Sequence, residues 1–583
     1  MPEPHHYKSI LFFLASLSVS FLQASSLQAQ GSDSLASRKK DRLASVISYH
    51  TPYGYTQVQQ MLPDSRLQLH SSSLTTVHIT GTCKQDRHQP TSLGNGFAEF
   101  SVGADSYIRL AENAKRKARK KDKEYSDAFW GNAHYTYGRK QAVIGNETSD
   151  YLTLFPYIMS DTAGGDLTYE KYSFGGGYAR GNDKIRWGAS LDYAAKQEYR
   201  KVDPRPRNIT SDLNIEASMA FRLPGRYFLG FGIEGGLYNQ SNQVAFYNPL
   251  GGPPTYNMTG LESYLTRFSL DNTSIDYAGG HYGSSLSLSP GGRQGWHSTL
   301  SYKHQRLTRT SNGGSANIEL DLNTLDYDIF SWKTAYWNPG HHRLPWGISL
   351  CLDYEHRYGK DIIYGPSQSN IYPELMRVRN MDIHHGETRL QADFLWEQTD
   401  GDFFLQPFAA YEFLSYRHQS PDESFEGMSF SLGGRLRKAW ALSGNARQRQ
   451  AARPRKGSGT PLAKENRGRK INEWPEQIQS APIAGENMDR PLRRSQRENV
   501  FSLGGELSYC QGSGVLDPAA NLGLDARWAI GIGKASFHID LSARYGYFLS
   551  ESWRNMMPWV EYARRSGHSP HVFRIQLGIG FNF

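Results

Sequence analysis

The sequence lacks the long apolar run that defines a helical membrane protein. A transmembrane helix needs about 20 consecutive apolar residues, and the only apolar run of note in the 583 residues, 10–22, is 13 residues long. The mean hydropathy is −0.61. These values exclude helical spans but not a β-barrel, because barrel strands are apolar on one face only and their loops are polar.

Cysteine is also scarce. The chain has three, Cys83, Cys351 and Cys510, and an odd, widely spaced set is not a disulfide framework. The sequence has neither a C-x-x-C nor an H-E-x-x-H pattern. We therefore expect no metal site and no cofactor.

The short apolar run has the layout of a secretory signal. It follows Lys8 and small residues follow it, so we expect a signal peptide over residues 1–29 with cleavage after Ala29. A membrane anchor is the alternative, and the length of the run disfavours it. Residues 30–70 then form a short periplasmic segment, too short for the globular plug of TonB-dependent receptors.

Glycine and aromatic residues are abundant, with 57 Gly, 35 Tyr and 27 Phe. At the end of the chain, large apolar residues occupy every second position, and the residues between them are polar or Gly. A strand places such residues on one face. The pattern resembles the last strand of a Gram-negative outer-membrane barrel, which the barrel-assembly machinery recognises; a soluble β-protein is the alternative. The expected assembly signal is Phe573, Ile575, Leu577, Ile579, Phe581 and Phe583.

The same alternation recurs along residues 71–583 and predicts an all-β, transmembrane antiparallel up-and-down barrel in outer-membrane lipid. We count about 18 strands, within a range of about 16–20. If the last strand ends in the periplasm, the short turns fall at that side, namely 180–183, 224–225, 290–293, 338–344, 398–401 and 533–534. The long loops then fall outside, namely 139–166, 199–208, 239–273, 306–324, 358–386, 417–426 and 549–570. Such a separation is typical of outer-membrane barrels.

Two basic inserts account for the net charge of +9. Residues 111–126 carry a net charge of +4 and residues 443–498 a net charge of +7, which leaves −2 for the rest of the chain. Both are predicted on the periplasmic side, and we expect them to be disordered. They are either tolerated solvated loops or contacts for a periplasmic or cell-wall partner of acidic character; we expect no nucleic-acid partner.

A barrel of this size encloses an aqueous interior, so inward-facing charged residues are candidate pore-lining groups. They form either a solvated, mutually paired wall or a selectivity constriction. The candidates are Arg186, Asp192, Lys196, Glu216, Arg222, Glu234, Asp353, Glu355, Arg357, Arg389, Asp393 and Arg435.

The loop at 146–166 combines carboxylates, aromatic residues and glycines. It either folds inward and narrows the pore, which we favour, or binds a sugar or Ca²⁺; its spacing does not match an EF-hand. A proline-rich turn follows at 202–208. The candidate ligand contacts are Glu147, Asp150, Tyr151, Asp161, Asp166, Arg205 and Arg207.

The segments ETSDYLTLFPYIMSDTAGGDL (147–167), EYRKVDPRPRN (198–208), FAEFSVGADSYIRL and FWGNAHYTYGRK resemble a family of uncharacterised outer-membrane β-barrel proteins from Gram-negative Bacteroidota. The resemblance implies fold and location but no site. The leading hypothesis is a channel or transporter for small solutes, and we expect no enzyme. The alternatives are a structural or surface-interaction barrel with an occluded lumen and, less favoured, a rim-located hydrolase.

Overall fold

The computed structural model describes much of the chain between residues 62 and 582. The described ranges are 62–68, 73–86, 90–110, 126–248, 252–260, 263–265, 274–291, 294–312, 319–338, 346–367, 371–398, 401–420, 422–443, 498–514, 519–532, 535–548 and 571–582. The expected signal peptide, most of segment 30–70, nearly all of both basic inserts and Phe583 lie outside them. No helix in these ranges is long and apolar enough to cross a membrane.

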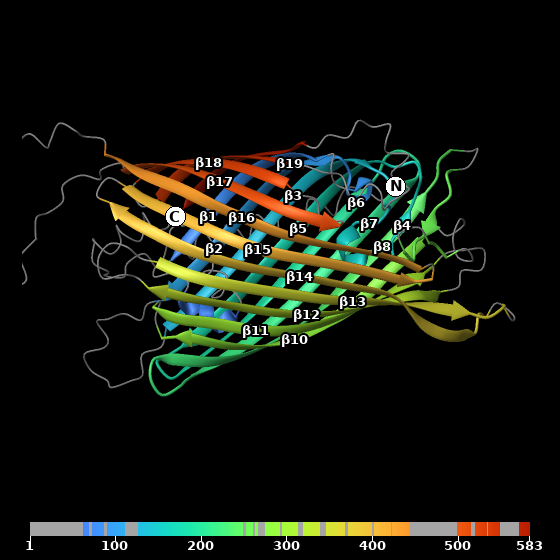
Figure 1. The fold of residues 1–583 in the computed structure, drawn as a ribbon, viewed down its shortest axis with the longest axis horizontal. Helices are drawn as coiled ribbons and strands as arrows, with labels where there is room; N and C mark the ends of the chain where they lie inside the picture. The colour runs from blue at the N-terminus through green and yellow to red at the C-terminus, as the bar shows by residue number, and fades with distance from the viewer. Residues whose placement is uncertain are drawn as a thin grey trace, which may run out of the picture.

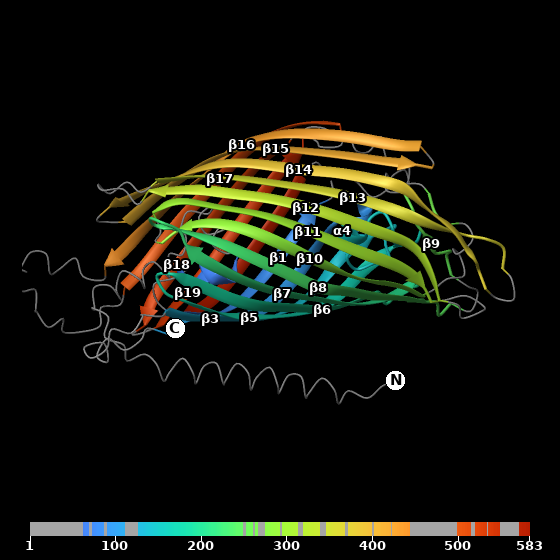
Figure 2. The ribbon, with the colours of Figure 1, turned by 90° about the horizontal axis from the view of Figure 1, so that it is seen from below.

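Eighteen strands form one antiparallel sheet, as the sequence predicts. They are β1 (Leu74–Asp86), β2 (Gly96–Leu110), β3 (Ser126–Val143), β5 (Gly165–Gly181), β6 (Ile185–Tyr199), β7 (Arg205–Arg222), β8 (Tyr227–Ala245), β10 (Ser274–Pro290), β11 (Gly295–Ser311), β12 (Leu320–Asn338), β13 (Trp346–Tyr364), β14 (Glu374–Gln398), β15 (Gly401–Gln419), β16 (Asp422–Ser443), β17 (Glu498–Gly514), β18 (Ala519–Ile532), β19 (Ala535–Phe548) and β20 (His571–Asn582). They cross obliquely around one elongated barrel (Figures 1 and 2).

The sheet closes on itself through its first and last strands. β1 pairs antiparallel with β20 from Thr76↔Asn582 to Asp86↔Val572, and β1 also pairs with β2. Each of the remaining strands of the sheet pairs with the sheet strand before it and the sheet strand after it in the sequence. Closure satisfies the backbone groups that an open sheet edge would leave unpaired in lipid.

The outer face of the barrel is an apolar belt. On β6, Ile185, Trp187 and Leu191 are each more than 40% exposed, whereas Arg186, Gly188 and Ser190 between them are buried. On β20, Phe573, Ile575, Leu577, Ile579 and Phe581 are all exposed on the same side. Apolar side chains exposed all around a closed barrel are the lipid-facing surface, and the chain is therefore an outer-membrane β-barrel.

The connections separate into two groups, at opposite ends of the barrel. The six predicted short turns all lie at the end where β20 finishes, which we call the short-turn end, and both basic inserts connect strands there. The opposite end, the loop end, carries the connections after β1, β3, β6 and β8. It also carries two small elements, β4 (Met159–Ser160), labelled at the right of Figure 1, and β9 (Tyr256–Asn257), labelled at the right of Figure 2.

Several predicted loop boundaries are wrong because the strands continue beyond the apolar belt. β14 begins at Glu374, whereas the sequence pattern places its start at Glu387. The predicted loop 199–208 shrinks to 200–204, and that at 417–426 to 420–421. In the extensions, polar side chains pair on the outer face, as Arg306 does with Asp326 and His356 with Asp382, so the apolar alternation is lost.

Candidate functional site

The loop after β3 folds into the barrel, where its backbone is hydrogen-bonded to side chains of the inner wall. The Glu147 carbonyl accepts hydrogen bonds from the amide groups of Asn208 (2.8 Å) and Asn242 (2.7 Å), which face inward from β7 and β8. The Glu147 N–H donates to the Met159 carbonyl across the loop. Residues 146–149 are all buried, so the loop is a fixed part of the interior.

A buried ion network fixes the two sides of this loop. The Arg200 guanidinium donates to Glu147 Oε1 (3.1 Å) and Asp161 Oδ2 (2.7 Å), and all three side chains are 0% exposed. Burial, together with the neighbouring Asp161 carboxylate, raises the pKa of Glu147 well above its ordinary value, against the opposing effect of Arg200. The network therefore favours a proton on Glu147.

Asp150 anchors the loop to the wall as an ion. It accepts from Lys196 Nζ (2.8 Å) and from the Tyr238 hydroxyl (2.8 Å). Burial disfavours its charged form, but the Lys196 ammonium and these hydrogen bonds prevail and lower the pKa of Asp150. The short helix α4 (Tyr151–Leu154) starts at the next residue, and Arg357 on β13 donates to the carbonyls of Leu152 (2.9 Å) and Phe155 (3.1 Å).

A second loop packs on the first. β9 pairs with β4 through Met159↔Asn257 and Ser160↔Tyr256. The fully buried Arg309 guanidinium, from β11, joins both loops by donating to the carbonyls of Met258 (2.7 Å) and Ile158 (3.3 Å). Backbone pairing and one guanidinium thus hold the two loops together.

The two loops share a hydrophobic core with one side of the inner wall, from β8 to β15. Its sixteen buried members are Leu154, Tyr157, Ile158, Met159, Tyr238, Val244, Met258, Ile275, Tyr277, Leu307, Leu322, Leu325, Tyr327, Met381, Ile383 and Tyr416. Large side chains that face an aqueous lumen would be exposed, and here they are covered. This side of the interior is therefore filled at the loop end.

A third segment enters from the short-turn end. The 3-10 helix η1 (Pro63–Gln68) contacts β3, β5, β6 and β7, and its blue coil lies inside the ring of strands in both views (Figures 1 and 2). Asp64 accepts a hydrogen bond from the Ser218 hydroxyl (2.6 Å), and Arg66 stacks over the Trp130 ring at 4.7 Å. This described part of the expected periplasmic segment is thus an internal element.

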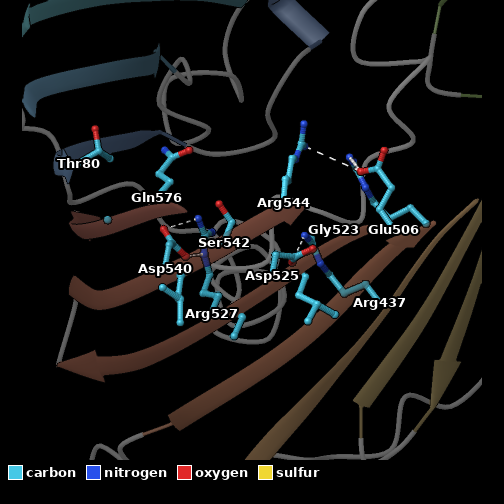
Figure 3. A pocket seen from close by; sticks show the side chains of 15 residues that line it. Thr80, Arg437, Glu506, Gly523, Asp525, Arg527, Asp540, Ser542, Arg544 and Gln576 are labelled. Atoms are coloured by element: carbon cyan, nitrogen blue, oxygen red, sulfur yellow. Dashed lines mark hydrogen bonds and ion pairs between the residues drawn. The ribbon is translucent and has the colours of Figure 1, made fainter. Parts of the chain in front are cut away.

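A charged hollow of about 310 Å³ lies on the inner wall of β16–β20 and β1 (Figure 3). Four arginines and three carboxylates alternate across it. Arg435 pairs with Glu506 (2.7 Å), Arg437 with Asp525, and Arg527 with Asp540 (2.9 Å). Arg544 lies 3.9 Å from Glu506 and its side chain is 60% exposed, which makes it the most solvated cation of the set.

A family model matches residues 65–455 and is described as a family of unknown function, DUF6850. The chain belongs to this family. No curated protein matches it. Among solved structures, the ferric preacinetobactin receptor BauA of Acinetobacter baumannii is similar at 9% identity and a TM-score of 0.35, over 87% of this chain and 80% of that one.

Two further structures are similar to this DUF6850 member. The siderophore receptor PirA of Pseudomonas aeruginosa has 8% identity and a TM-score of 0.32, over 88% of this chain and 81% of that one. OccAB3 of Acinetobacter baumannii has 11% identity and a TM-score of 0.27, over 88% and 99%.

The predicted pore-lining residues of this family member fall into several environments. Arg435 lines the hollow, and Glu216 and Glu234 face each other on β7 and β8. Lys196 and Arg357 hold the inserted loop, and Arg186 stacks on Phe228 at 3.7 Å. The remaining members are Asp192, exposed on the inner wall; Asp353, bonded to Ser331; Glu355, paired with Arg357; Arg389, over Phe408; and Asp393, bonded to Gln406. Arg222 lies at the short-turn rim and donates to the Gly225 carbonyl.

The predicted loop contacts are engaged mainly within the protein. Asp166 pairs with Arg139 (2.5 Å), Arg205 with Asp203 (2.7 Å), and Tyr151 packs near Phe155. Arg207 is exposed on the outer face of β7. A ligand-binding role for these residues stays a prediction. Arg205 and Arg207 both belong to β7, so the predicted rigid turn 202–208 is wrong at its second half.

Sequence reasoning did not single out two groups of residues that the fold brings together. Arg437, Asp525, Arg527, Asp540 and Arg544 lie at inward positions of their strands, and the alternation that identified Arg435 was sufficient to find them. By contrast, two sets with metal-ligand character, His78–Asp105–His134 and His356–Asp382–His384, each gather residues from different strands. No spacing along the sequence reveals such sets, and the expectation of no metal site stays a prediction.

Proposed function

We propose that this outer-membrane barrel is a channel for small solutes whose passage follows the wall of β16–β20 and β1. One observation carries the proposal: the inserted loops fill the side of β8–β15, and the charged hollow lies on the other side. A solute on this route meets side chains whose charges are already arranged in pairs. Rings or ladders of charged groups are how pores discriminate between permeant solutes.

The charge balance of the hollow supports a preference for anionic solutes. It holds four arginines and three carboxylates, and each carboxylate is within hydrogen-bond distance of an arginine. The excess cation is Arg544, which is also well solvated. A solvated positive group beside low-dielectric walls raises the local concentration of anions.

Ion selectivity in planar bilayers tests this route. We expect the purified protein to conduct, with a reversal potential that favours anions in a salt gradient. Arg544→Glu should shift that potential towards cations. Arg207→Glu, which changes an exposed arginine on the outer face, is the matched control. An equal shift in both variants, or none in either, contradicts the proposed route.

An occluded structural or surface-interaction barrel is the second candidate. The sixteen-residue core beneath the loops supports it, because such a core resembles a permanent filling rather than a gate. Trimming the loop 144–164 separates the two candidates. Absence of conductance both before and after trimming would favour the occluded barrel.

We further propose that the short-turn end faces the periplasm, so that both basic inserts meet an acidic periplasmic or cell-wall partner there. Unchanged co-purifying partners after deletion of 445–497 would contradict this role.

Recognition by the barrel-assembly machinery and a Bacteroidota origin stay predictions. We propose a transport role and no catalytic one, which a substrate panel with purified protein tests against the rim-located hydrolase.

A further inference from the structure

Five neighbouring strands place three histidines in one row on the inner wall. The hydrogen-bonded register joins His538 on β19 to Gly580 on β20, Gly580 to His78 on β1, His78 to Gly103 on β2, and Gly103 to His134 on β3. Histidine and glycine alternate along the row. All five residues lie at inward positions of their strands.

The glycine between His78 and His134 makes room for their rings. A Cβ at Gly103 would overlap the His134 ring and lie 2.8 Å from His78 Nε2. Without that side chain, the two imidazole rings approach to 5.3 Å between centroids. The strand sequence thus leaves space for two imidazoles to converge.

Asp105 completes the arrangement two residues along β2 from Gly103, on the same face. Its Oδ2 lies 3.5 Å from His78 Nδ1, and its Oδ1 lies 3.1 Å from His134 Nε2. One ligand atom from each of the three side chains lies within 4.8 Å of the other two. The carboxylate therefore sits between two imidazole nitrogens.

These spacings are close to those around a bound ion. Metal–nitrogen and metal–oxygen bonds of about 2.0–2.2 Å in a tetrahedron place ligand atoms about 3.3 Å apart. Two imidazoles and a carboxylate are donors that suit zinc, copper and nickel. We propose that His78, Asp105 and His134 bind one divalent transition-metal ion of this class inside the barrel.

The site is open to the lumen and adjoins the charged hollow. The side chains of His78, Asp105 and His134 are 24%, 51% and 27% exposed, so water can complete the coordination. The next inward residues on β1, β20 and β19, namely Thr80, Gly578 and Asp540, line the hollow. Binding of the ion does not depend on conduction, so it holds or fails independently of the proposed channel.

The second set, His356–Asp382–His384, is less suited to a cation. Its Asp382 pairs with the Arg379 guanidinium, which also lies 3.1 Å from His356 Nε2, and His384 Nδ1 is bonded to the Tyr354 hydroxyl. A fixed positive charge within the set repels a metal ion. This set supplies the matched control.

The test uses the full chain, folded in detergent and free of any polyhistidine tag. Calorimetric titration with Zn²⁺ should give one ion per chain, and electron paramagnetic resonance with Cu²⁺ should show two nitrogen ligands. Changes in an outer shell alone cost about 10–100-fold in affinity, so His134→Ala and Asp105→Asn should each lose more than about tenfold. His356→Ala should bind as the wild type does.

Gly103→Ala is a second variant that spares all three ligands. Its Cβ displaces the His134 ring, so it should also weaken binding, and heat-modifiable migration on gels checks that each variant folds. The proposal is overturned if the wild type binds no stoichiometric ion. It is also overturned if folded His134→Ala and Gly103→Ala retain wild-type affinity, or if His356→Ala is the variant that loses the ion.

Discussion

Arg200 follows directly after β6, and its guanidinium joins two carboxylates of the inserted loop with no exposure to water. Removing one partner from such a network leaves an uncompensated buried charge, which typically costs about 3–5 kcal/mol. This side chain therefore contributes strongly to keeping the loop docked. Its position beside a proline-rich turn gave no sign of that role, because the role depends on which loop folds beneath it.

Glu147 should make loop docking sensitive to pH. The pKa of Glu147 is raised above the ordinary 4.5 in the docked state. Between pH 4.5 and this raised pKa, the docked loop therefore holds a proton that the undocked loop releases. Docking is then fully favoured below 4.5 and weakens as pH rises towards the raised pKa. Asp150 has a lowered pKa and loses its contribution only below its ordinary 3.8, outside this window.

Limited proteolysis within residues 144–164 measures this effect in detergent. Wild-type cleavage should accelerate as the pH rises above the ordinary carboxyl pKa of about 4.3. Glu147→Gln keeps an oxygen acceptor for Arg200 and cannot titrate, so its cleavage should follow only the protease's own pH dependence. Parallel pH profiles for the two proteins would show that Glu147 is not the titrating group.

At the scale of single elements, alternation predicts the membrane-crossing part of each strand but not its extension. The sequence predicts β6 nearly in full, because Ile185, Trp187 and Leu191 face lipid. It misses residues 374–386 of β14, where Arg377 pairs with Glu374 and Arg379 with Asp382 on a strand beyond the belt. Hydrogen bonds to β13 specify that extension, and such pairing leaves no periodic signal.

The element η1 depends on a glycine of the wall. A Cβ at Gly188 would lie 2.7 Å from the Pro63 carbonyl carbon, so Gly188→Val should displace η1 from the interior. We expect faster proteolysis near residues 62–68, while the barrel keeps its heat resistance.

Gly81→Val is the control for this substitution. A Cβ at Gly81 meets nothing within 4 Å, so this variant should keep the wild-type cleavage rate. Equal protection of residues 62–68 in Gly188→Val and wild type would show that the strand tolerates the side chain without moving η1.

At the scale of the whole molecule, the sequence predicts the closed barrel and about eighteen strands, because nearly every strand carries its own alternation. It does not predict the filled interior, since the core beneath the loops joins residues from Leu154 to Tyr416 that only closure brings together. The charged part of the inner wall, on β16–β20 and β1, is predicted only in part. Its residues alternate predictably, but their pairing across strands depends on register.

Assembly should depend on the apolar face of β20, which pairs with β1 and β19 to close the barrel. Phe581→Asp places a charge on the lipid face, and truncation of Phe583 removes the predicted recognition signal. Both should abolish heat-resistant, membrane-inserted protein in outer-membrane fractions. Gln576→Glu, which changes a residue of β20 that lines the hollow on the inner wall, should assemble normally. Full assembly of Phe581→Asp would contradict the lipid-facing assignment.

The most direct test of the proposed route is cysteine accessibility during conduction, in a background where Cys83, Cys351 and Cys510 are replaced by serine. Ser542→Cys and Gln576→Cys place thiols in the hollow, whereas Gln240→Cys places one at a position that is 1% exposed beside the docked loop. We predict that a charged thiol reagent reduces the single-channel current of the first two variants and leaves the third unchanged. Block of Gln240→Cys alone would contradict a passage along β16–β20 and β1.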